Sequence, residues 1–389
     1  MKTRSLNTIA FITGSVSRSA LVLVPFIASD LGLNLSQSGF TRSLNGIMKI
    51  ALIGFVLVLA KKYNNRKLIY LAMLTYSLGT ILMGTAFSFE SMIIFQIFTN
   101  FGFSTLSPII RSELAAIAKG PSKGRIISNF SSSGELGGLI ATTVIGFLAV
   151  WIGWRFSHVI LGVLAIVGLV FIIKFEQKHK AEEVEVKTKQ GEPLKYFYKN
   201  KKLLAALMCT FFDNIASASV FLFIPFLVLA YKYDPIYVPI ISGIALFGAV
   251  IGKFFFGRLT DTHRPELVFI VCETLMAVVC LTMALTSNIV LLLIAATILG
   301  ITTKGTNPVR FILVGDAVKT EDTRNAFAID SVFDNAGSLI APVFFGIIGD
   351  AFGTPAIFIG FTIASLLAVV PASIYYRLNN RIGSPDTSV

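Results

Sequence analysis

Long apolar stretches alternate with short polar segments along the whole chain. A helix that crosses a bilayer core about 30 Å thick needs about 20 apolar residues, and the stretches reach this length. Most of them contain Gly, Pro and Ser, which is usual in membrane helices because small residues let backbones approach closely. The pattern predicts an all-α integral membrane protein with twelve transmembrane helices. The predicted spans are 6–28, 40–60, 68–88, 91–114, 126–151, 156–175, 203–231, 236–257, 266–286, 289–314, 326–349 and 354–376.

The composition supports a membrane protein and excludes several other classes. Hydrophobic residues make up 54% of the 389 and charged residues only 14%, whereas an average soluble domain has about 25% charged residues. A soluble enzyme, a disordered chain and a disulfide scaffold are therefore excluded. Cys209, Cys272 and Cys280 lie in apolar stretches, and the sequence has no CxxC pair and no His/Cys cluster. No metal site and no cofactor are expected.

The positive charges predict the orientation of the chain. If the N-terminus is cytoplasmic, the inner segments hold 24 of the 33 Lys and Arg residues, and the outer segments hold only Arg155 and Lys232. Cationic loops are retained on the cytoplasmic side. Both termini are therefore predicted to be cytoplasmic, in a multi-pass protein of the plasma membrane, such as a bacterial inner membrane. The net charge of +12 is then explained by topology, and no nucleic-acid partner is expected.

An internal repeat and a long polar segment divide the chain into two halves. The predicted organisation is an N-terminal six-helix bundle (1–175), a cytoplasmic linker (176–202) and a C-terminal six-helix bundle (203–389). Residues match at a constant offset of 200 in three separate regions. A parallel repeat of two six-helix halves is typical of alternating-access transporters. The matching pairs include Pro25 and Pro225, Pro108 and Pro308, Gly137 and Gly337, and Gly153 and Gly353.

Short motifs give the chain a resemblance to the major facilitator superfamily. After the eighth predicted span, GRLTDTHRP is similar to the family's loop motif, with Gly257, Leu259 and Asp261 matching and Arg264 near the usual basic position. The resemblance implies two pseudo-symmetric six-helix bundles and a gating or switch role for Gly257, Asp261 and Arg264 at the inner face. The copy after the second span is degraded, because Lys61 stands where an Asp is expected. Asp261 is therefore the stronger candidate.

Within the family, the resemblance points to twelve-helix bacterial members of the drug/proton antiporter type. The segment ASDLGLNLSQSG (28–39) is similar to their first outer loop, and IGWR (152–155) looks like the turn before their sixth span. Two positions depart from the pattern. Gln96 lies where the fourth-span Arg is expected, and the fifth span reads SGELGG where an antiporter would have G-P-x-x-G-G. These departures weaken the prediction of antiport.

Charged residues near the middle of the predicted spans are the main candidates for a functional site. A charge at the bilayer centre costs about 2.5–3.5 kcal/mol on insertion scales, so such residues face protein or a watery cavity. Carboxylates in such a cavity can carry a proton, and cations can bind a carboxylate or phosphate of a solute. The predicted substrate-binding residues are Arg18, Lys49, Lys304 and Asn214, and the predicted proton-coupling residues are Asp213, Glu135 and Asp334.

Other roles for the membrane charges are also consistent with the sequence. They could pair with one another and only stabilise the helix packing. Arg111 and Arg310 lie near the inner ends of the fourth and tenth spans, where a role in an inner gate or in snorkelling is favoured over substrate contact. The family fold implies that the third, sixth, ninth and twelfth helices form an outer ring, and Glu273 on the ninth span is the charged exception.

These features predict a secondary active transporter for a small organic solute, anionic or zwitterionic, that works by alternating access and draws on a proton or other ion gradient. Multidrug-type drug/proton antiport is the alternative within transport, and the direction of movement stays open. A channel is disfavoured by the duplicated design. A membrane-embedded enzyme or sensor is a remote alternative, because the sequence lacks a clustered nucleophile and base. The predicted partners are the small-molecule substrate and the lipid bilayer, with the protein a monomer.

Overall fold

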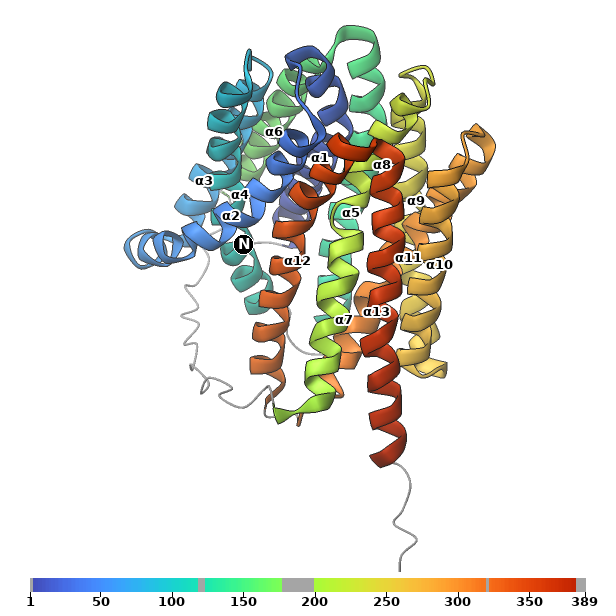
Figure 1. Cartoon of the computed structure of the whole chain (residues 1–389). Coiled ribbons are helices and arrows are strands. Elements are labelled where there is room, and N and C mark those ends of the chain that lie inside the picture. The colour runs from blue at the N-terminus through green and yellow to red at the C-terminus, as the bar shows by residue number, and fades with distance from the viewer. Residues whose placement is uncertain (1–2, 118–122, 177–198, 320–321, 383–389) are drawn as a thin grey trace, which may run out of the picture. The chain divides into compact units, whose positions relative to one another are not determined.

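The computed structural model describes residues 3–117, 123–176, 199–319 and 322–382, and every regular element among them is a helix (Figure 1). Asparagine side chains cap several helix starts. The side-chain oxygen of Asn288, for example, accepts hydrogen bonds from the backbone N–H groups of Val290 and Leu291. The helices are α1 (Thr3–Leu31), α2 (Leu35–Lys62), α3 (Asn65–Met83), α4 (Phe89–Ile117), α5 (Lys123–Ile152), α6 (Trp154–Glu176), α7 (Lys201–Ser217), α8 (Val220–Ala230), α9 (Tyr237–Thr262), α10 (Pro265–Leu285), α11 (Ile289–Gly315), α12 (Thr323–Phe352) and α13 (Thr354–Ile382).

The twelve predicted spans all coincide with helical structure. The third prediction ran too far, because α3 ends at Met83, and the seventh span is divided between α7 and α8. Within the described ranges, nine stretches are long and apolar enough to cross a membrane, with α7 and α8 counted as one stretch. The prediction of an all-helical membrane protein is confirmed. Most of the predicted linker, residues 177–198, lies outside the described residues.

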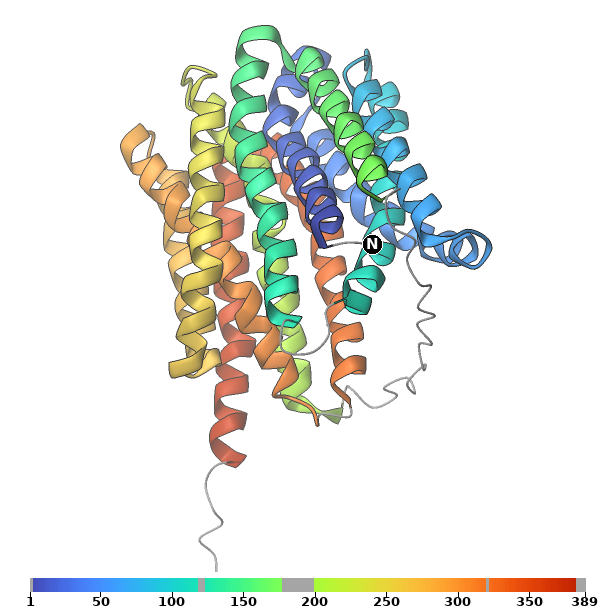
Figure 2. The same ribbon diagram turned by 180° about the vertical axis from the view of Figure 1, so that it is seen from behind.

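The helices group into two compact units. The first unit is Met1–Thr188 with Tyr233–Gly243, and the second unit is Lys189–Lys232 with Ile244–Val389. In the first unit, α1 packs along α5 and α6, and α3 packs against α4 and α6; the dark-blue α1 runs beside the green α5 in the view from behind (Figure 2). In the second unit, α10 packs against α11 and α13, and α7 packs against α12 and α13.

The internal repeat is visible in the backbone at the ends of α5 and α12. Gly153 follows α5 and Gly353 follows α12, and both have a φ angle of 85°, a left-handed conformation that favours glycine. The N–H of Gly153 donates to the carbonyl of Ala149 over 3.1 Å, and that of Gly353 donates to Gly349 over 2.8 Å. Each glycine thus ends one helix and turns the chain directly into the next.

Glycine also permits equivalent close helix contacts in both units. A Cβ atom on Gly137 in α5 would lie 2.3 Å from the carbonyl oxygen of Phe11 in α1, and one on Gly337 in α12 would lie 3.0 Å from that of Phe211 in α7. A larger residue would push the helices apart. Because both contacts join residues at the same offset, the sequence repeat reflects a repeat in helix packing.

The seventh predicted span is not one continuous helix. Ala218 is the C-cap of α7, and Ser219 is the N-cap of α8 but makes no capping hydrogen bond through its side chain. Pro225 lies within α8, but the matching Pro25 lies within the unbroken α1, so proline alone does not cause the break. Interrupted helices occur in membrane proteins where protein or a watery cavity surrounds the freed backbone groups. The side chain of Ser219 is fully buried, in agreement with this rule.

Candidate functional site

Arg310 on α11 connects charged side chains from two other helices of the second unit. Its Nε lies 3.1 Å from Oδ2 of Asp213 on α7, and its Nη1 lies 3.1 Å from Oδ1 of Asp334 on α12. The side chain of Arg310 is 11% exposed, that of Asp213 is 0% exposed, and that of Asp334 is 43% exposed. One guanidinium therefore bridges a fully buried carboxylate and a carboxylate that is accessible to water.

Neutral polar groups support this arrangement, which we call the Arg310 cluster. Nη2 of Arg310 donates to Oδ1 of Asn307 over 2.6 Å. The hydroxyl of Thr306 donates to Oδ1 of Asp213 over 3.0 Å. Both oxygens of Asp213 thus face a positive or donating group, and this compensates for the loss of water around a buried charge. The members of the cluster are Thr210, Asp213, Asn214, Thr306, Asn307, Arg310, Asp330 and Asp334.

The α12 side of the cluster contains two carboxylates. The hydroxyl of Thr210 donates to Oδ1 of Asp330 over 2.6 Å, and the carbonyl of Thr210 accepts from Arg310 over 3.3 Å. The side-chain amide of Asn214 donates to the carbonyl of Asp334 over 2.9 Å and also to its carboxylate. Asp330 and Asp334 are separated by one helical turn, so they share one face of α12. This spacing was a signal in the sequence that Asp330 belongs to the site.

Glu273 on α10 is a further carboxyl group in the second unit. Its side chain is 0% exposed, and the side chains of Asp213 and Ser365 lie beside it. Neither of its carboxyl oxygens accepts a hydrogen bond from another described residue. The sequence marked Glu273 only as an exception in an outer ring of helices. In the structure it faces the interior of its unit, next to the Arg310 cluster.

The structure brings some of the predicted residues together and changes the interpretation of Arg310. Asp213, Asn214 and Asp334 meet at one guanidinium, although the sequence could not say which charges are neighbours. Arg310, for which a role in an inner gate or in snorkelling was predicted, is ion-paired with two carboxylates inside the second unit, and its role stays a prediction. Nζ of Lys304, also on α11, lies 5.7 Å from the ring centroid of Phe221 on α8.

In the first unit, Arg18 on α1 pairs with Glu135 on α5. Nη2 of Arg18 lies 3.3 Å from each carboxylate oxygen of Glu135, and the two side chains are 23% and 17% exposed. Gly138 provides space for the pair, because a Cβ atom there would lie 2.6 Å from Cγ of Arg18. The pair is partly exposed, so a carboxylate from outside the protein could take the place of Glu135.

Arg42 on α2 adds a second guanidinium to this region. It is close enough to Arg18 for the two charges to repel each other, and no described carboxylate forms an ion pair with it. Gln96 on α4 holds the neighbouring backbone, since its Nε2 donates to the carbonyl of Thr41 over 2.6 Å. Sequence reasoning missed Arg42 because it lies at the beginning of span 40–60 and not near its middle. A charged residue within the predicted span 40–60 was the available signal.

Several buried polar side chains of the first unit have no hydrogen-bond partner among the residues described. They are the hydroxyls of Ser19 on α1, Ser104 and Thr105 on α4 and Thr142 on α5, together with the side-chain nitrogen of Asn100 on α4. Most buried polar groups in proteins are hydrogen-bonded to protein or to water. The interior of the first unit therefore offers donors and acceptors to water or to a polar solute.

An apolar cavity of about 360 Å³ also lies between α1, α5 and α6 of the first unit. Its wall includes Phe11, Ile12, Val16, Ile140 and Leu164. Phe11, Ile140 and Leu164 are exposed, so the cavity opens at the surface of the unit. An apolar molecule would fit this cavity, whereas a charged solute would find no compensating group there.

The residues of the loop motif lie where α9 ends and α10 begins. Nη1 of Arg264 donates to Oδ1 of Asn380 over 2.7 Å, and its guanidinium lies 5.2 Å from the ring centroid of Tyr376, also on α13. Nε of Arg264 is 3.9 Å from Oε1 of Glu266, whose side chain is fully buried. Arg264 therefore ties the start of α10 to the end of α13 within the second unit.

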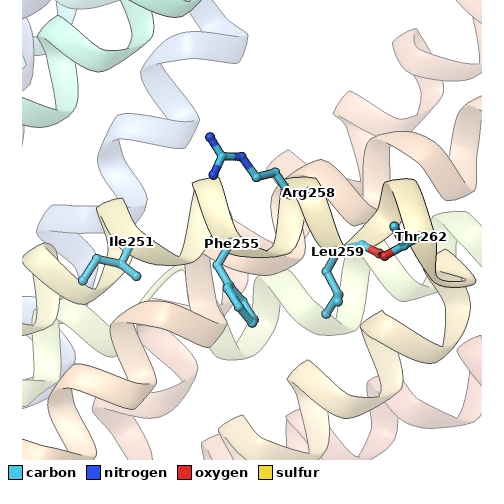
Figure 3. Close-up of a pocket in the computed structure, with 5 residues that line it drawn as sticks. All are labelled: Ile251, Phe255, Arg258, Leu259 and Thr262. Carbon is cyan, nitrogen blue, oxygen red and sulfur yellow. The ribbon is translucent and has the colours of Figure 1, made fainter.

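A hollow of about 520 Å³ runs along the last turns of α9, next to this motif. It is lined by Ile251, Phe255, Arg258, Leu259 and Thr262 (Figure 3). Arg258 extends from the opposite side of the helix to Phe255 and Leu259. One guanidinium among apolar groups does not define a catalytic or metal site, and groups of three or more His, Cys, Asp or Glu that could hold a metal are not found in the described ranges.

For four of the predicted site residues, the structure describes the helix that contains them but not their side chains or surroundings. These are Lys49 and Arg111, for which substrate binding and gating were predicted, and Gly257 and Asp261 of the loop motif. Their roles stay predictions.

Comparisons with known proteins agree with this architecture. The family model of the Major Facilitator Superfamily matches residues 6–245 and 203–388 of the chain. The chain is 28% identical over 216 residues to a hexuronate transporter of Bacillus subtilis (strain 168), in a match that covers 53% of this chain and 51% of that protein. The chain thus spans about half the length of the curated relatives it matches.

Two groups of solved structures share the fold over nearly the full length. One is a bacterial homolog of the human lysosomal transporter Spinster, in an inward-facing and occupied conformation, with a TM-score of 0.76, 16% identity and coverage of 97% of this chain and 96% of that chain. The other is the nucleoside transporter NupG, with a TM-score of 0.79, 13% identity and coverage of 97% and 100%. At these identities the likeness shows the fold alone.

Proposed function

Because the chain belongs to the Major Facilitator Superfamily, we propose that it is a secondary transporter that moves a small organic anion together with protons. Members of this family are transporters with two six-helix halves around a substrate path, and they work by alternating access. The observation that carries the proposal is the opposite charge character of the two units, each considered by itself. Among the described residues, the first unit places the guanidinium groups of Arg18 and Arg42 near each other, and the second unit places several carboxyl groups around Arg310.

The first unit supplies the groups that would recognise an anion. Arg18 pairs with the carboxylate of Glu135, and Arg42 lies close enough to Arg18 for their charges to repel each other. A guanidinium binds a carboxylate through two parallel hydrogen bonds, which gives both affinity and orientation. A carboxylate solute would compete with Glu135 for Arg18, and protonation of Glu135 would favour the solute. This competition is a physical route by which proton binding and anion binding become coupled.

The second unit supplies carboxyl groups that could carry the coupled protons. Asp213, Asp330 and Asp334 surround the single guanidinium of Arg310. Carboxyl groups that share one cation in a poorly solvated site are candidates for taking up a proton during the transport cycle. Asp334 is the carboxylate of the pair with access to water, so protons would enter there. Asn214, which holds Asp334, and Lys304 are proposed as additional solute contacts from this half.

The proposed substrate class is the sugar acids. The relative of Bacillus subtilis is named for hexuronates, which combine one carboxylate with several hydroxyl groups. The carboxylate matches Arg18 and Arg42, and the hydroxyl groups match the unpartnered donors and acceptors of Asn100, Ser104 and Thr105 on α4. A purely apolar site would not recognise such a molecule, because its hydroxyl groups would lose hydrogen bonds to water.

Flux into proteoliposomes tests this proposal. Purified protein would be reconstituted, and uptake of radiolabelled glucuronate would be measured with and without an inwardly directed proton gradient. We expect the gradient to drive accumulation that a protonophore abolishes. Uptake that ignores the gradient would contradict proton coupling, and binding of no sugar acid in a thermal-shift screen would contradict the substrate class.

Drug/proton antiport is the second candidate function, and the apolar cavity between α1, α5 and α6 supports it. An antiporter of this type would expel a lipophilic compound as protons enter. The same proteoliposomes, loaded with a fluorescent lipophilic cation, distinguish the two functions. Efflux of the dye in exchange for protons, without glucuronate uptake, would replace the symport proposal.

We also propose the remaining features that the sequence predicted. Residues 1–175 and 203–389 would be the two bundles, joined by a cytoplasmic linker, in a monomer in the bacterial inner membrane with both termini cytoplasmic. Gly257, Asp261 and Arg264, with Arg111 and Arg310, would control the inner gate. Labelling of single cysteines placed in the polar segments tests the orientation, because only the predicted outer segments should react with an impermeant reagent in intact cells.

A further inference from the structure

Glu273 is fully buried on α10, and no described cation forms an ion pair with it. Neither carboxyl oxygen accepts a hydrogen bond from a described residue, and the guanidinium of Arg310 is already paired with Asp213 and Asp334. A buried carboxylate without compensation is so unfavourable that the group takes up a proton instead. The surroundings of Glu273 therefore favour the neutral acid.

Asp213, directly beside Glu273, is in the opposite situation. Its Oδ1 accepts a hydrogen bond from Thr306 over 3.0 Å, and its Oδ2 lies 3.1 Å from Nε of Arg310. One oxygen of Asp213 thus faces a hydroxyl donor and the other faces a cation. Yet Oδ2 accepts no well-directed hydrogen bond from a described residue, because the guanidinium approaches it as an ion pair only. Asp213 thus has one oxygen that could accept a further donor.

The contact between the two carboxyl groups becomes favourable only when one of them carries a proton. The side chains of Glu273 and Asp213 are within hydrogen-bonding range, but two carboxylates are both acceptors and would repel each other. A proton on Glu273 turns the contact into an O–H···O bond to an ionised acceptor, which is among the strong hydrogen bonds. It also supplies the missing donor to Asp213.

The other groups around Glu273 include one hydroxyl donor, Ser365, but no second cation among the described residues. The cation that acts on Glu273 is Arg310, and its guanidinium is already ion-paired with Asp213 and Asp334. Thiols and one hydroxyl make up the rest of the polar surroundings, and they add no positive charge. The groups that face Glu273 are Asp213 and Cys209 from α7, Arg310 from α11, Ser365 from α13, and Cys272 and Cys280 from α10 itself.

We propose that Glu273 is a resident acid, protonated while Asp213 is ionised, whose O–H donates to Asp213 and holds that carboxylate against Arg310. The role of Glu273 in transport rests on the proposed proton-coupled function, whereas its protonation and its contact with Asp213 do not. Glu273 is then a positioning residue: the proton that is transported binds to Asp213 or Asp334, and the proton of Glu273 stays in place. A glutamine could substitute for it, because its amide is also a neutral donor.

Infrared spectroscopy tests the protonation state without any substrate. Purified protein at neutral pH should show a carbonyl stretching band of a protonated carboxylic acid that shifts on exchange into D₂O, and Glu273→Gln should abolish it. Glu266→Gln is the matched control, since Glu266 is also fully buried on α10 but accepts from Asn379 over 3.1 Å and lies near Arg264. A wild-type protein without the band, or a band that persists in Glu273→Gln, would overturn the proposal.

Transport of radiolabelled glucuronate tests the positioning role. Glu273→Gln should keep gradient-driven accumulation and its pH profile, whereas Glu273→Leu, which removes the donor, should shift the pH profile. Loss of accumulation in Glu273→Gln would mean that Glu273 carries the moving proton and would overturn the resident assignment. Asp213→Asn distinguishes a failure of the proposed function from a failure of the inference about Glu273. If this variant still accumulates glucuronate, the proposed coupling through Asp213 is wrong, while the infrared result for Glu273 in the wild-type protein is unaffected.

Discussion

The guanidinium of Arg310 lies 3.1 Å from Asp213 and 3.1 Å from Asp334, so one cation connects α11 to both α7 and α12. The first carboxylate is fully buried, and the second is accessible to water. Protonation of either carboxylate would weaken its ion pair with Arg310, so the guanidinium would interact mainly with the other carboxylate. The interaction of α11 with α7 and with α12 in the second unit therefore depends on one shared guanidinium.

Removal of the shared cation should strongly destabilise the protein. Arg310→Met leaves Asp213 as a buried charge without its partner, and breaking a buried pair in this way costs about 3–5 kcal/mol. The measurement is thermal unfolding of the purified protein in detergent. The double variant Arg310→Met/Asp213→Asn should recover much of the loss, because the uncompensated charge is gone. Equal stability of the single and double variants would contradict the pairing.

Arg18 should contribute directly to anion affinity. A hydrogen bond to a charged group is worth about 1.5–3 kcal/mol, so Arg18→Ala should weaken glucuronate binding about 10- to 100-fold. The apparent affinity in proteoliposome uptake measures this effect. Arg155→Ala is the matched control, because Arg155 is ion-paired with Asp30 and half-exposed. If Arg18→Ala retained wild-type affinity, Arg18 would not belong to the substrate site.

Two glycines on α5 should respond differently to alanine. A Cβ atom on Gly137 would lie 2.3 Å from the carbonyl oxygen of Phe11, whereas one on Gly134 would lie 3.4 Å from that of Ala10. Overpacking typically costs about 1–3 kcal/mol, so Gly137→Ala should lower the unfolding temperature and Gly134→Ala should leave it nearly unchanged. The same unfolding temperature for both variants would show that α1 and α5 can separate without cost.

Arg264 should affect transport rate more than stability. Its side chain is 47% exposed, and the buried Glu266, 3.9 Å away, keeps its hydrogen bond from Asn379, so Arg264→Ala should unfold near the wild-type temperature. The variant loses the bond to Asn380 that ties α10 to α13, and we expect slower glucuronate counterflow with unchanged affinity. Arg264→Lys keeps the charge but not the fork geometry and should be intermediate. A wild-type counterflow rate in Arg264→Ala would remove it from the proposed gate.

The sequence alone was sufficient for the helices and the repeat, because both depend on local composition. A bilayer requires long apolar stretches, so the spans were visible. The errors were the end of the third span, which ran past Met83, and the break at Ala218 and Ser219 within the seventh span. Gly153 and Gly353 matched in the sequence and have the same φ angle in the structure. Arg18 and Asp213 stood out because a charge is rarely tolerated in lipid.

The partners of those charges were decided only by the tertiary structure. Counting along a span tells how deep a residue lies in the membrane, but not which side chain of a facing helix it meets. Arg18 and Glu135 are 117 residues apart in the chain, and the rotation and packing of α1 against α5 bring them together. For the same reason Arg310 became the centre of a cluster, and Arg42 and Glu273 gained a role that their positions in the sequence did not indicate. Depth follows from local hydrophobicity, whereas pairing depends on long-range helix packing.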